Sequence, residues 1–223
     1  MKECMKTLDR LEADQSFSNI FAILSDYGDR VCAEYSTPEG GMMSMTYAEE
    51  TARYRRVASA LTESLAGLTG FVGLKAQNSP NWPALYWAIL MSGCSPLLLD
   101  AAAEPAMTAH LLNEAGAVAI ITDDPAQYEL KKISPEDILN KREDVNFTPV
   151  WGKYTALCTS GTTGTAKIFA YDEKAFCAQI LSTRGILETD ETGSIMYDYK
   201  KGSLKQLVFL PLHHIFGFMA VYM

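Results

Sequence analysis

The chain has 223 residues, 48% of them hydrophobic and 21% charged, which is typical of a globular protein with one large or two small domains. Its formal net charge of −8 argues against nucleic acid and anionic membranes as partners, because neither would find a basic surface. The five cysteines lack C-x-x-C spacing, and with three histidines they form no zinc pattern, which favours a reducing cytoplasm as the location.

Neither a secretory signal nor a membrane span is predicted. Residues 1–14 carry charges of both signs and no apolar core, unlike a signal peptide. The longest apolar stretch, residues 83–99, is interrupted by Ser92-Gly93-Cys94-Ser95-Pro96. That break favours a helix, a turn and a strand over a membrane-spanning helix.

Helices and strands are predicted to alternate through the first 122 residues. A short helix over 18–27 is followed by a hairpin of strands 31–35 and 42–45. Thr46-Tyr47-Ala48-Glu49 is a capping box that begins a helix to Leu65. The next predicted elements are strand 71–76, helix 81–91, strand 96–99, helix 105–114 and strand 117–122. This βαβ spacing predicts an α/β fold, a mostly parallel sheet layered with helices on both faces.

The second half is predicted to hold fewer regular elements. Residues 123–152 are polar and of mixed charge, and we interpret them as a solvated connection rather than a binding surface. A helix capped by Asp172 is expected to run to about Glu188. Its inward residues are expected to be Ala175, Phe176, Ile180 and Leu187. A polar excursion follows over 190–201, and then a strand over 206–210 that breaks at Pro211 and turns into a helix.

A loop of small and hydroxyl residues separates two apolar runs. It reads Thr159-Ser160-Gly161-Thr162-Thr163-Gly164-Thr165-Ala166-Lys167. Small residues let backbone N–H groups turn toward an anion, the hydroxyl groups add donors, and the lysine adds positive charge. The composition predicts a phosphate-binding loop, and the alternative is a Gly/Thr-rich turn with no ligand.

A Walker A loop does not fit the spacing. When Gly161 and Lys167 are aligned on G-x-x-x-x-G-K-[ST], Ala166 stands at the second glycine and Ile168 at the magnesium-binding Ser or Thr. Residues 168–171 also have the pattern of a strand, and the next helix starts only at Asp172. The predicted unit is therefore strand, loop, strand, which argues against a P-loop NTPase.

The loop resembles the phosphate-binding loop of the adenylate-forming (AMP-binding) enzymes. This superfamily includes acyl-CoA synthetases, luciferase-like enzymes and peptide-synthetase adenylation domains. Their signature is approximately T-S-G-[ST]-T-G-x-P-K-G, and the chain departs from it at Ala166, for proline, and at Ile168, for glycine. Loss of the proline is expected to make the second half of the loop less rigid. The resemblance extends to residues 46–49 and 71–100.

A second motif lies near the end of the chain, Leu210-Pro211-Leu212-His213-His214-Ile215-Phe216-Gly217. It resembles the family motif L-P-x-x-H-x-x-G, which borders the acyl-substrate pocket. By this match His214 takes the position of the recurring histidine and His213 that of its more variable neighbour. An imidazole there can donate to a carboxylate or adenylate oxygen. For both residues the alternative is a histidine that only caps backbone groups.

The resemblance implies that the parent protein activates a carboxylic acid with ATP. The acid attacks the α-phosphorus, pyrophosphate leaves, and the acyl group passes from the adenylate to a thiol. ATP, Mg²⁺ and CoA are implied as cofactors or co-substrates, with a carrier-protein thiol as the other possible acceptor. The implied nucleotide-binding residues are Thr159, Ser160, Gly161, Thr162, Thr163, Gly164 and Lys167. His213 and His214 are implied to line the substrate pocket, with His214 as the catalytic residue.

The resemblance also implies a division of the chain. Residues 1–150 are expected to form an N-terminal α/β subdomain, and residues 151–223 the phosphate-loop strand pair with the start of an acyl-pocket subdomain. The chain is expected to be the N-terminal piece of a longer enzyme and inactive alone. A different class of function stays open, in which the chain is a noncatalytic nucleotide-binding or scaffold fragment that self-associates, for example as a homodimer.

Overall fold

The computed structural model describes residues 2–37, 39–141, 147–159, 166–187 and 205–222. At its centre is a six-stranded sheet with the order β6-β5-β3-β4-β7-β8. The strands are β3 (Phe71–Lys75), β4 (Ser95–Leu98), β5 (Ala117–Thr122), β6 (Lys131–Ile133), β7 (Tyr154–Thr159) and β8 (Lys167–Asp172). Neighbouring strands are parallel except β7 and β8, which are antiparallel. The predicted α/β fold with a mostly parallel sheet is confirmed.

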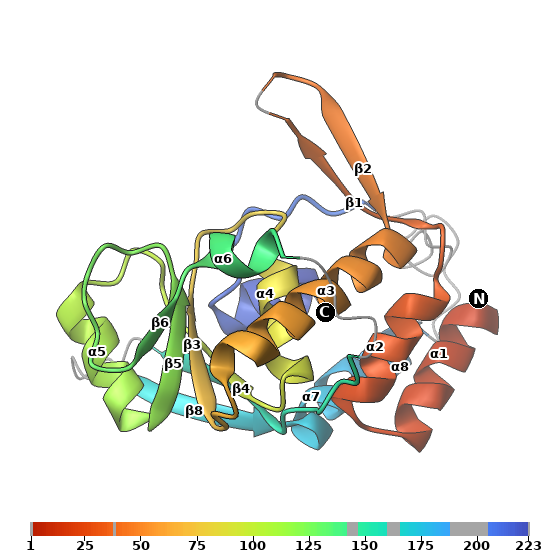
Figure 1. Cartoon of the computed structure of the whole chain (residues 1–223). Coiled ribbons are helices and arrows are strands. Elements are labelled where there is room, and N and C mark those ends of the chain that lie inside the picture. The colour runs from red at the N-terminus through yellow and green to blue at the C-terminus, as the bar shows by residue number, and fades with distance from the viewer. Residues whose placement is uncertain (1, 38, 142–146, 160–165, 188–204, 223) are drawn as a thin grey trace.

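Helices pack on both faces of this sheet (Figure 1). The described α-helices are α1 (Lys2–Ala13), α2 (Phe17–Asp26), α3 (Tyr47–Leu65), α4 (Trp82–Met91), α5 (Pro105–Glu114), α6 (Pro135–Leu139), α7 (Glu173–Leu181) and α8 (Arg184–Leu187). On one face Leu98 and Ile121 join the large core formed with α2, α3 and α4. On the other face Leu97 and Ile120 pack with Leu112 of α5. Successive strand residues thus alternate between two apolar cores, as the pleat of a strand requires.

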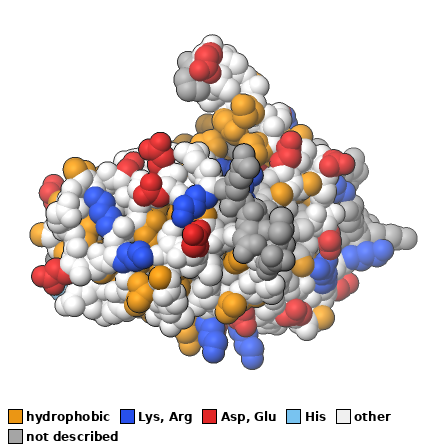
Figure 2. Space-filling view, viewed as in Figure 1, with side chains coloured by type: hydrophobic (Ala, Val, Ile, Leu, Met, Phe, Trp, Pro, Cys, Tyr) orange, Lys and Arg blue, Asp and Glu red, His pale blue; other side chains and the backbone are white. Residues whose placement is uncertain are grey.

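A two-stranded hairpin projects from the body of the molecule. It consists of β1 (Val31–Ser36) and β2 (Met42–Thr46), paired antiparallel as predicted. Figure 2 shows apolar side chains gathered near its base, whereas acidic and basic side chains are scattered over the rest of this face. The predicted capping box begins α3 directly after the hairpin, and the helix ends at Ala66, which is in the left-handed conformation.

The solvated connection predicted over 123–152 contains regular structure that was not predicted. This segment contains β6, which pairs with β5, and the short helix α6. Each element buries one isoleucine, Ile133 or Ile138. A single buried residue gives no hydrophobic periodicity, and the residues around it are mostly polar or charged. Neither element could therefore be recognised from the sequence. The N-terminal helix α1 was likewise not predicted.

The helix predicted from Asp172 to about Glu188 is interrupted. Asp172 caps it as expected, but α7 ends at Leu181 and α8 follows separately. The hydroxyl groups of Ser182 and Thr183 donate to the carbonyl oxygens of Gln179 and Ile180. Such local bonds compete with the helical pattern.

Of the residues expected to face inward from this helix, two do so. Phe176 is buried and Ile180 is packed against the core. Ala175 is exposed, so that expectation is wrong, and the side chain of Leu187 lies outside the described residues. The predicted polar excursion over 190–201 also lies outside them.

The strand predicted over 206–210 is not formed. These residues pair with no strand in the part of the chain that the structure describes, and Leu207 and Phe209 are exposed. Apolar residues alone do not make a strand, because its backbone needs a hydrogen-bonding neighbour. A turn follows, and then a π-helical segment over Gly217–Tyr222. Among the described helices, none has both the length and the apolar character needed to cross a membrane.

Candidate functional site

The predicted phosphate loop is carried by the hairpin of β7 and β8. These strands pair antiparallel, and Thr159 at the end of β7 lies opposite Lys167 at the start of β8. The predicted strand on each side of the loop is therefore confirmed. Two of the predicted phosphate-binding residues, Thr159 and Lys167, are therefore neighbours across the hairpin, and both are exposed. The other five, Ser160, Gly161, Thr162, Thr163 and Gly164, lie outside the described residues.

A small cleft opens beside this hairpin. Its volume is about 200 Å³, and it is lined by Leu157, Cys158, Thr159, Phe169, Tyr171, His214 and Ile215. The cleft brings the phosphate loop and the second motif together, since Thr159 and His214 share its wall. Hydroxyl and imidazole groups on an otherwise apolar wall suit a ligand with an apolar body and a polar end. Lys167 and His213 are not among its lining residues.

Asn78 fixes the turn that carries His214. Its amide nitrogen donates to the carbonyl oxygen of Leu210 at 2.7 Å, and its amide oxygen accepts from the backbone N–H of Leu212 at 3.0 Å. The turn closes with a bond from the His214 N–H to the Pro211 carbonyl oxygen at 3.2 Å. The sequence alone gave Asn78 no role, because its partners are more than a hundred residues away in the chain.

The residues after His214 anchor the turn in the core. Phe218 is buried, and its ring lies 4.9 Å from that of Tyr86 and 5.3 Å from that of Phe176. Gly217 approaches Pro211 so closely that a Cβ atom would lie 2.3 Å from the Pro211 carbonyl oxygen. The glycine of the motif is therefore required by backbone packing.

His213 is next to His214 in the turn but does not line the cleft. Its side chain is 13% exposed, and its ring centroid is 4.3 Å from that of His214. Nε2 of His213 is 3.8 Å from Oδ1 of Asp100. Burial lowers the pKa of His213, and the positive charge of His214 lowers it further, whereas the negative charge of Asp100 raises it. The net shift is downward, so burial outweighs the carboxylate. Asp100 was not predicted as a site residue; its place after a buried strand was the available signal.

Cys158 contributes a neutral thiol to the cleft. Burial, together with the charge of Glu114, raises its pKa to about 11. At neutral pH the thiolate is therefore rare, and Cys158 is unsuited to act as a nucleophile.

The described residues offer no evident metal centre. Within the parts of the chain that the structure describes, no three His, Cys, Asp or Glu side chains gather to hold an ion. Thr159 and Lys167 do fit a phosphate group, since they offer a hydroxyl donor and a cation at one hairpin end.

A second cleft, of about 540 Å³, lies elsewhere. Arg53 and Arg56 line it together with Asp123 and Glu136. Arg53 is already engaged by the Glu50 carboxylate, and by the oxygens of Asn81 and Pro80. With its charges mixed, this cleft favours neither an anion nor a cation.

Solved structures of two adenylate-forming proteins share the fold. O-succinylbenzoate CoA synthetase (MenE) from Bacillus subtilis in complex with AMP is 20% identical with a TM-score of 0.68, over 91% of this chain and 51% of that one. The same synthetase bound to the acyl-adenylate OSB-AMP gives a TM-score of 0.71 over 91% and 40%. The N-terminal subdomain of Klebsiella oxytoca NpsA is 20% identical with a TM-score of 0.63, over 74% and 43%.

The chain thus spans about half or less of the length of these structures. No curated protein matches it by sequence. The family model described as AMP-binding enzyme matches residues 22–223, and the chain belongs to this family.

Proposed function

We propose that the parent protein activates a carboxylic acid with ATP to form an acyl-adenylate, and then transfers the acyl group to a thiol, that of CoA. The observation that carries this proposal is the placement of Thr159 opposite Lys167 at a hairpin end, with His214 on the wall of the cleft that Thr159 also lines. One ligand with a phosphate end and an acyl end would touch both motifs.

Each motif has a separate task in this reaction. The Thr159 hydroxyl and the Lys167 ammonium bind the β- and γ-phosphates together with Ser160, Gly161, Thr162, Thr163 and Gly164. They hold pyrophosphate as negative charge moves onto it. His214 donates to the carboxylate or to the adenylate oxygen and orients the acid for attack on the α-phosphorus. His213 supports the pocket from behind. No enzyme side chain becomes bonded to the substrate, so the rate comes from positioning and charge stabilisation.

The structural relatives support the class of ligand. MenE has been solved with AMP, with an acyl-adenylate and with the product analogue OSB-NCoA. NpsA has been solved with 3-hydroxybenzoyl-AMSN. On this basis ATP, taken with Mg²⁺, a small carboxylic acid and CoA are the proposed substrates, and a carrier-protein thiol is the other acceptor. A cytoplasmic location agrees with these substrates.

The proposal includes the two subdomains expected from sequence. Residues 1–150 would form the N-terminal α/β subdomain, and residues 151–223 would begin the part that holds the acyl group. The pairing of β4 with β7 joins the two in one sheet.

Substrate-dependent exchange of pyrophosphate into ATP tests the proposal. The full-length parent would be assayed with short, long and aromatic carboxylates, and the 223-residue chain in parallel. We expect exchange by the parent with one class of acid and none by the chain alone. Absence of exchange with every acid would contradict the proposal, provided that the parent is folded.

A second candidate is a noncatalytic nucleotide-binding fragment that self-associates. It is favoured by the exposure of large apolar side chains after the loop, with Leu207 80%, Phe209 71% and Phe216 67% exposed. Sedimentation of the chain over a range of concentrations, with and without ATP, tests it. Dimers that bind ATP without exchange activity in the parent would favour this candidate, and a monomer at all concentrations would exclude self-association.

A further inference from the structure

The turn over residues 211–214, here called the histidine turn, lies beside the carboxyl ends of two parallel strands, β3 and β4. Asn78 follows β3 and binds the backbone of Leu210 and Leu212. Asp100 follows β4 and faces the ring of His213. In open parallel sheets this edge is where ligand-binding residues collect. The backbone contacts of Asn78 position the turn, whereas Asp100 faces a titratable side chain.

The ring of His213 has an unmet hydrogen-bonding group. Its Nε2 atom is buried and has no hydrogen-bond partner among the described residues. Oδ1 of Asp100 lies 3.8 Å away, about 1 Å beyond a normal hydrogen bond. A buried polar atom without a partner is unusual in a folded protein and calls for an explanation. A small movement of either side chain would join the two.

Asp100 is held in place by the loop that it begins. Its Oδ1 atom accepts from the backbone N–H of Ala102 at 2.9 Å, and its carbonyl oxygen accepts from the N–H of Ala103 at 3.1 Å. The Ala103 carbonyl oxygen accepts in turn from Nζ of the buried Lys75 at 2.8 Å. The carboxylate therefore sits on a loop that is tied to the end of β3.

We propose that Asp100 is a positioning residue for the histidine pair: its carboxylate holds the imidazole of His213, whose Nε2 atom is buried, and the ring of His213 holds His214 at the cleft. The catalytic meaning of this arrangement rests on the function proposed above. The geometry itself does not depend on that function. It consists of the Asp100 carboxylate, the His213 ring with its buried Nε2 atom, and the contact between the rings of His213 and His214.

The charges around His213 give the sign of the effect. Among the described residues, Asp100 and His214 are the charged or titratable groups that act on it. Burial disfavours the imidazolium of His213, as does a charged His214, while Asp100 favours it. Removal of the carboxylate should therefore make His213 harder to protonate.

Nuclear magnetic resonance of the ring nitrogens tests the proposal on this chain. Three histidines are present, and His110 on α5 is an internal reference. In Asp100→Asn we expect the titration midpoint of His213 to fall by about 0.5–1 pH unit, the size of a unit-charge interaction near 4 Å in a solvated setting. The ring signals of His214 should also shift, while those of His110 stay unchanged.

Glu104→Gln is the matched control. Glu104 is an exposed residue that immediately precedes α5, four residues after Asp100. The substitution Glu104→Gln therefore removes the same charge as Asp100→Asn. It should leave the His213 midpoint unchanged. An unchanged midpoint in Asp100→Asn, or an equal fall in both variants, would overturn the proposal.

A measurement on the unsubstituted chain covers the case in which Asp100→Asn does not fold. The ¹³C chemical shift of the Asp100 carboxyl should change at the pH where His213 titrates. A flat signal through that pH would overturn the proposal without any variant.

An activity measurement separates this inference from the proposed function. In the full-length parent, Asp100→Asn should raise the KM for the carboxylate several-fold and leave the KM for ATP unchanged. Asp100→Glu should recover part of the loss. Equal changes in both KM values would overturn a positioning role at the acyl end. If the unsubstituted parent shows no exchange at all, the proposed function fails, and the resonance measurements alone decide whether Asp100 holds His213.

Discussion

At the scale of single residues, two positions matter for the candidate site: the positively charged Lys167, and Gly217, which has no side chain. Lys167 is exposed at the start of β8 and has no ion-pair partner in the described part of the chain, so its charge is available to a ligand. Gly217 leaves room for the Pro211 carbonyl oxygen beneath the histidine turn. The first residue concerns ligand binding and the second concerns the shape of the turn.

Replacing Lys167 with alanine should remove the positive charge that is proposed to bind the terminal phosphates. In the full-length parent we expect ATP–pyrophosphate exchange to fall about 100-fold or more, as is typical when a group that stabilises developing charge is lost. Lys174→Ala on α7 removes an equally exposed lysine and should keep full activity. Unchanged exchange in Lys167→Ala would remove this residue from the phosphate site.

Gly217→Ala should disturb the histidine turn by steric overlap. The added Cβ would lie 2.3 Å from the Pro211 carbonyl oxygen and 3.0 Å from its carbon, both backbone atoms. We expect the free energy of unfolding to fall by about 1–3 kcal/mol, as for other overpacked sites, and the ring signals of His214 to move. Gly185→Ala in α8 meets no atom within 4 Å and should be neutral. Equal unfolding midpoints for both variants would contradict this account of Gly217.

At the scale of elements, α3 links the projecting hairpin to the core. Its first turn is closed by a capping box, in which the Thr46 hydroxyl accepts from the Glu49 N–H at 3.2 Å and the Glu49 carboxylate accepts from the Thr46 N–H at 2.8 Å. The same helix packs against α2, α4 and α6. Its start therefore fixes where the hairpin leaves the body.

Thr46→Ala should destabilise the start of α3. Loss of an N-cap hydroxyl usually lowers the free energy of unfolding by about 1 kcal/mol. Thr62→Ala is the control within the same helix, because the exposed Thr62 hydroxyl only donates back to the Ala58 carbonyl oxygen and alanine is the better helix former. Urea unfolding of both variants measures the difference. A Thr62→Ala variant as unstable as Thr46→Ala would show that the cap is not the cause.

The elements that sequence predicted well have strong local signals. Helix 105–114 and strand 117–122 match α5 and β5 residue for residue, because Pro105 marks the start of the helix and an apolar run forms the strand. The short elements β6 and α6 have one buried residue each and gave no pattern. The apolar run 206–210 suggested a strand, but strand formation requires a neighbour that sequence does not reveal.

The candidate site likewise has a part that the sequence predicted and a part that it did not. The loop proposed to bind phosphate is a local motif, and the strands predicted on either side of it are confirmed. The contacts of Asn78 with Leu210 and of Asp100 with His213 join residues more than a hundred positions apart. Such contacts follow from the order of strands in the sheet, and without that order neither residue could be assigned to the histidine turn.

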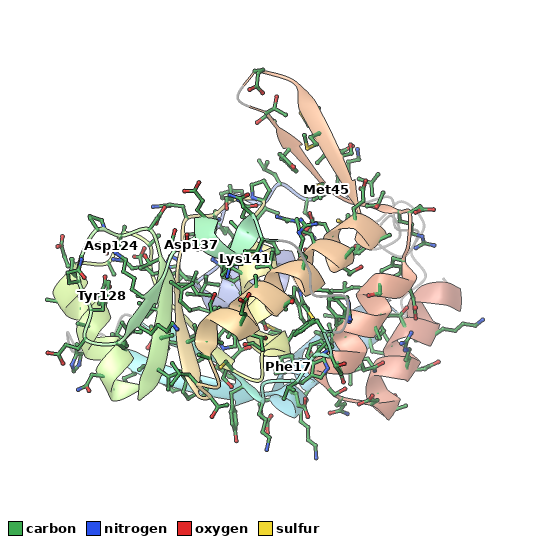
Figure 3. The ribbon with its side chains drawn as sticks, in the orientation of Figure 1. Phe17, Met45, Asp124, Tyr128, Asp137 and Lys141 are labelled. Atoms are coloured by element: carbon green, nitrogen blue, oxygen red, sulfur yellow. The ribbon has the colours of Figure 1, made fainter. Side chains whose placement is uncertain are left out.

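At the scale of the whole molecule, polar groups gather at the carboxyl end of the parallel sheet. Figure 3 shows Asp124 and Tyr128 near each other after β5. The Asp124 carboxylate forms an ion pair with the buried Lys75 of β3 and accepts from the Tyr128 hydroxyl at 2.9 Å. Lys75 also donates to Ala103 after β4. This cluster ties together the segments that follow three of the strands.

The cluster makes a specific contribution to acid stability. The hydrogen bond from Lys75, with those from the Ala126 N–H and the Tyr128 hydroxyl, lowers the pKa of Asp124 to about 2. Burial lowers the pKa of Lys75, but its contacts with Asp124 and Tyr128 outweigh burial and raise it. The folded-state pKa of Asp124 is below its unfolded value near 3.8. Its stabilising effect is therefore complete above pH 4 and is lost as pH falls toward 2.

Asp124→Asn should be less stable than the unsubstituted chain at neutral pH, because Lys75 stays buried without its carboxylate. The difference in the free energy of unfolding should be constant from pH 7 to about 4 and should shrink between pH 4 and 2, where Asp124 takes up a proton. Urea unfolding at a series of pH values measures it. Comparing the two proteins at each pH cancels the titration of the other carboxylates.

Asp123→Asn separates this effect from a general change in charge. Asp123 is the neighbouring carboxylate, is exposed, and lines the second cleft rather than the cluster. At neutral pH its free energy of unfolding should match that of the unsubstituted chain, because Asp123 is exposed and lies outside the cluster. If the curve of Asp124→Asn ran parallel to that of the unsubstituted chain, Asp124 would have the same pKa in the folded and unfolded states. The three strand ends would then be held by packing alone, and the ion pair with Lys75 would contribute nothing that depends on its charge.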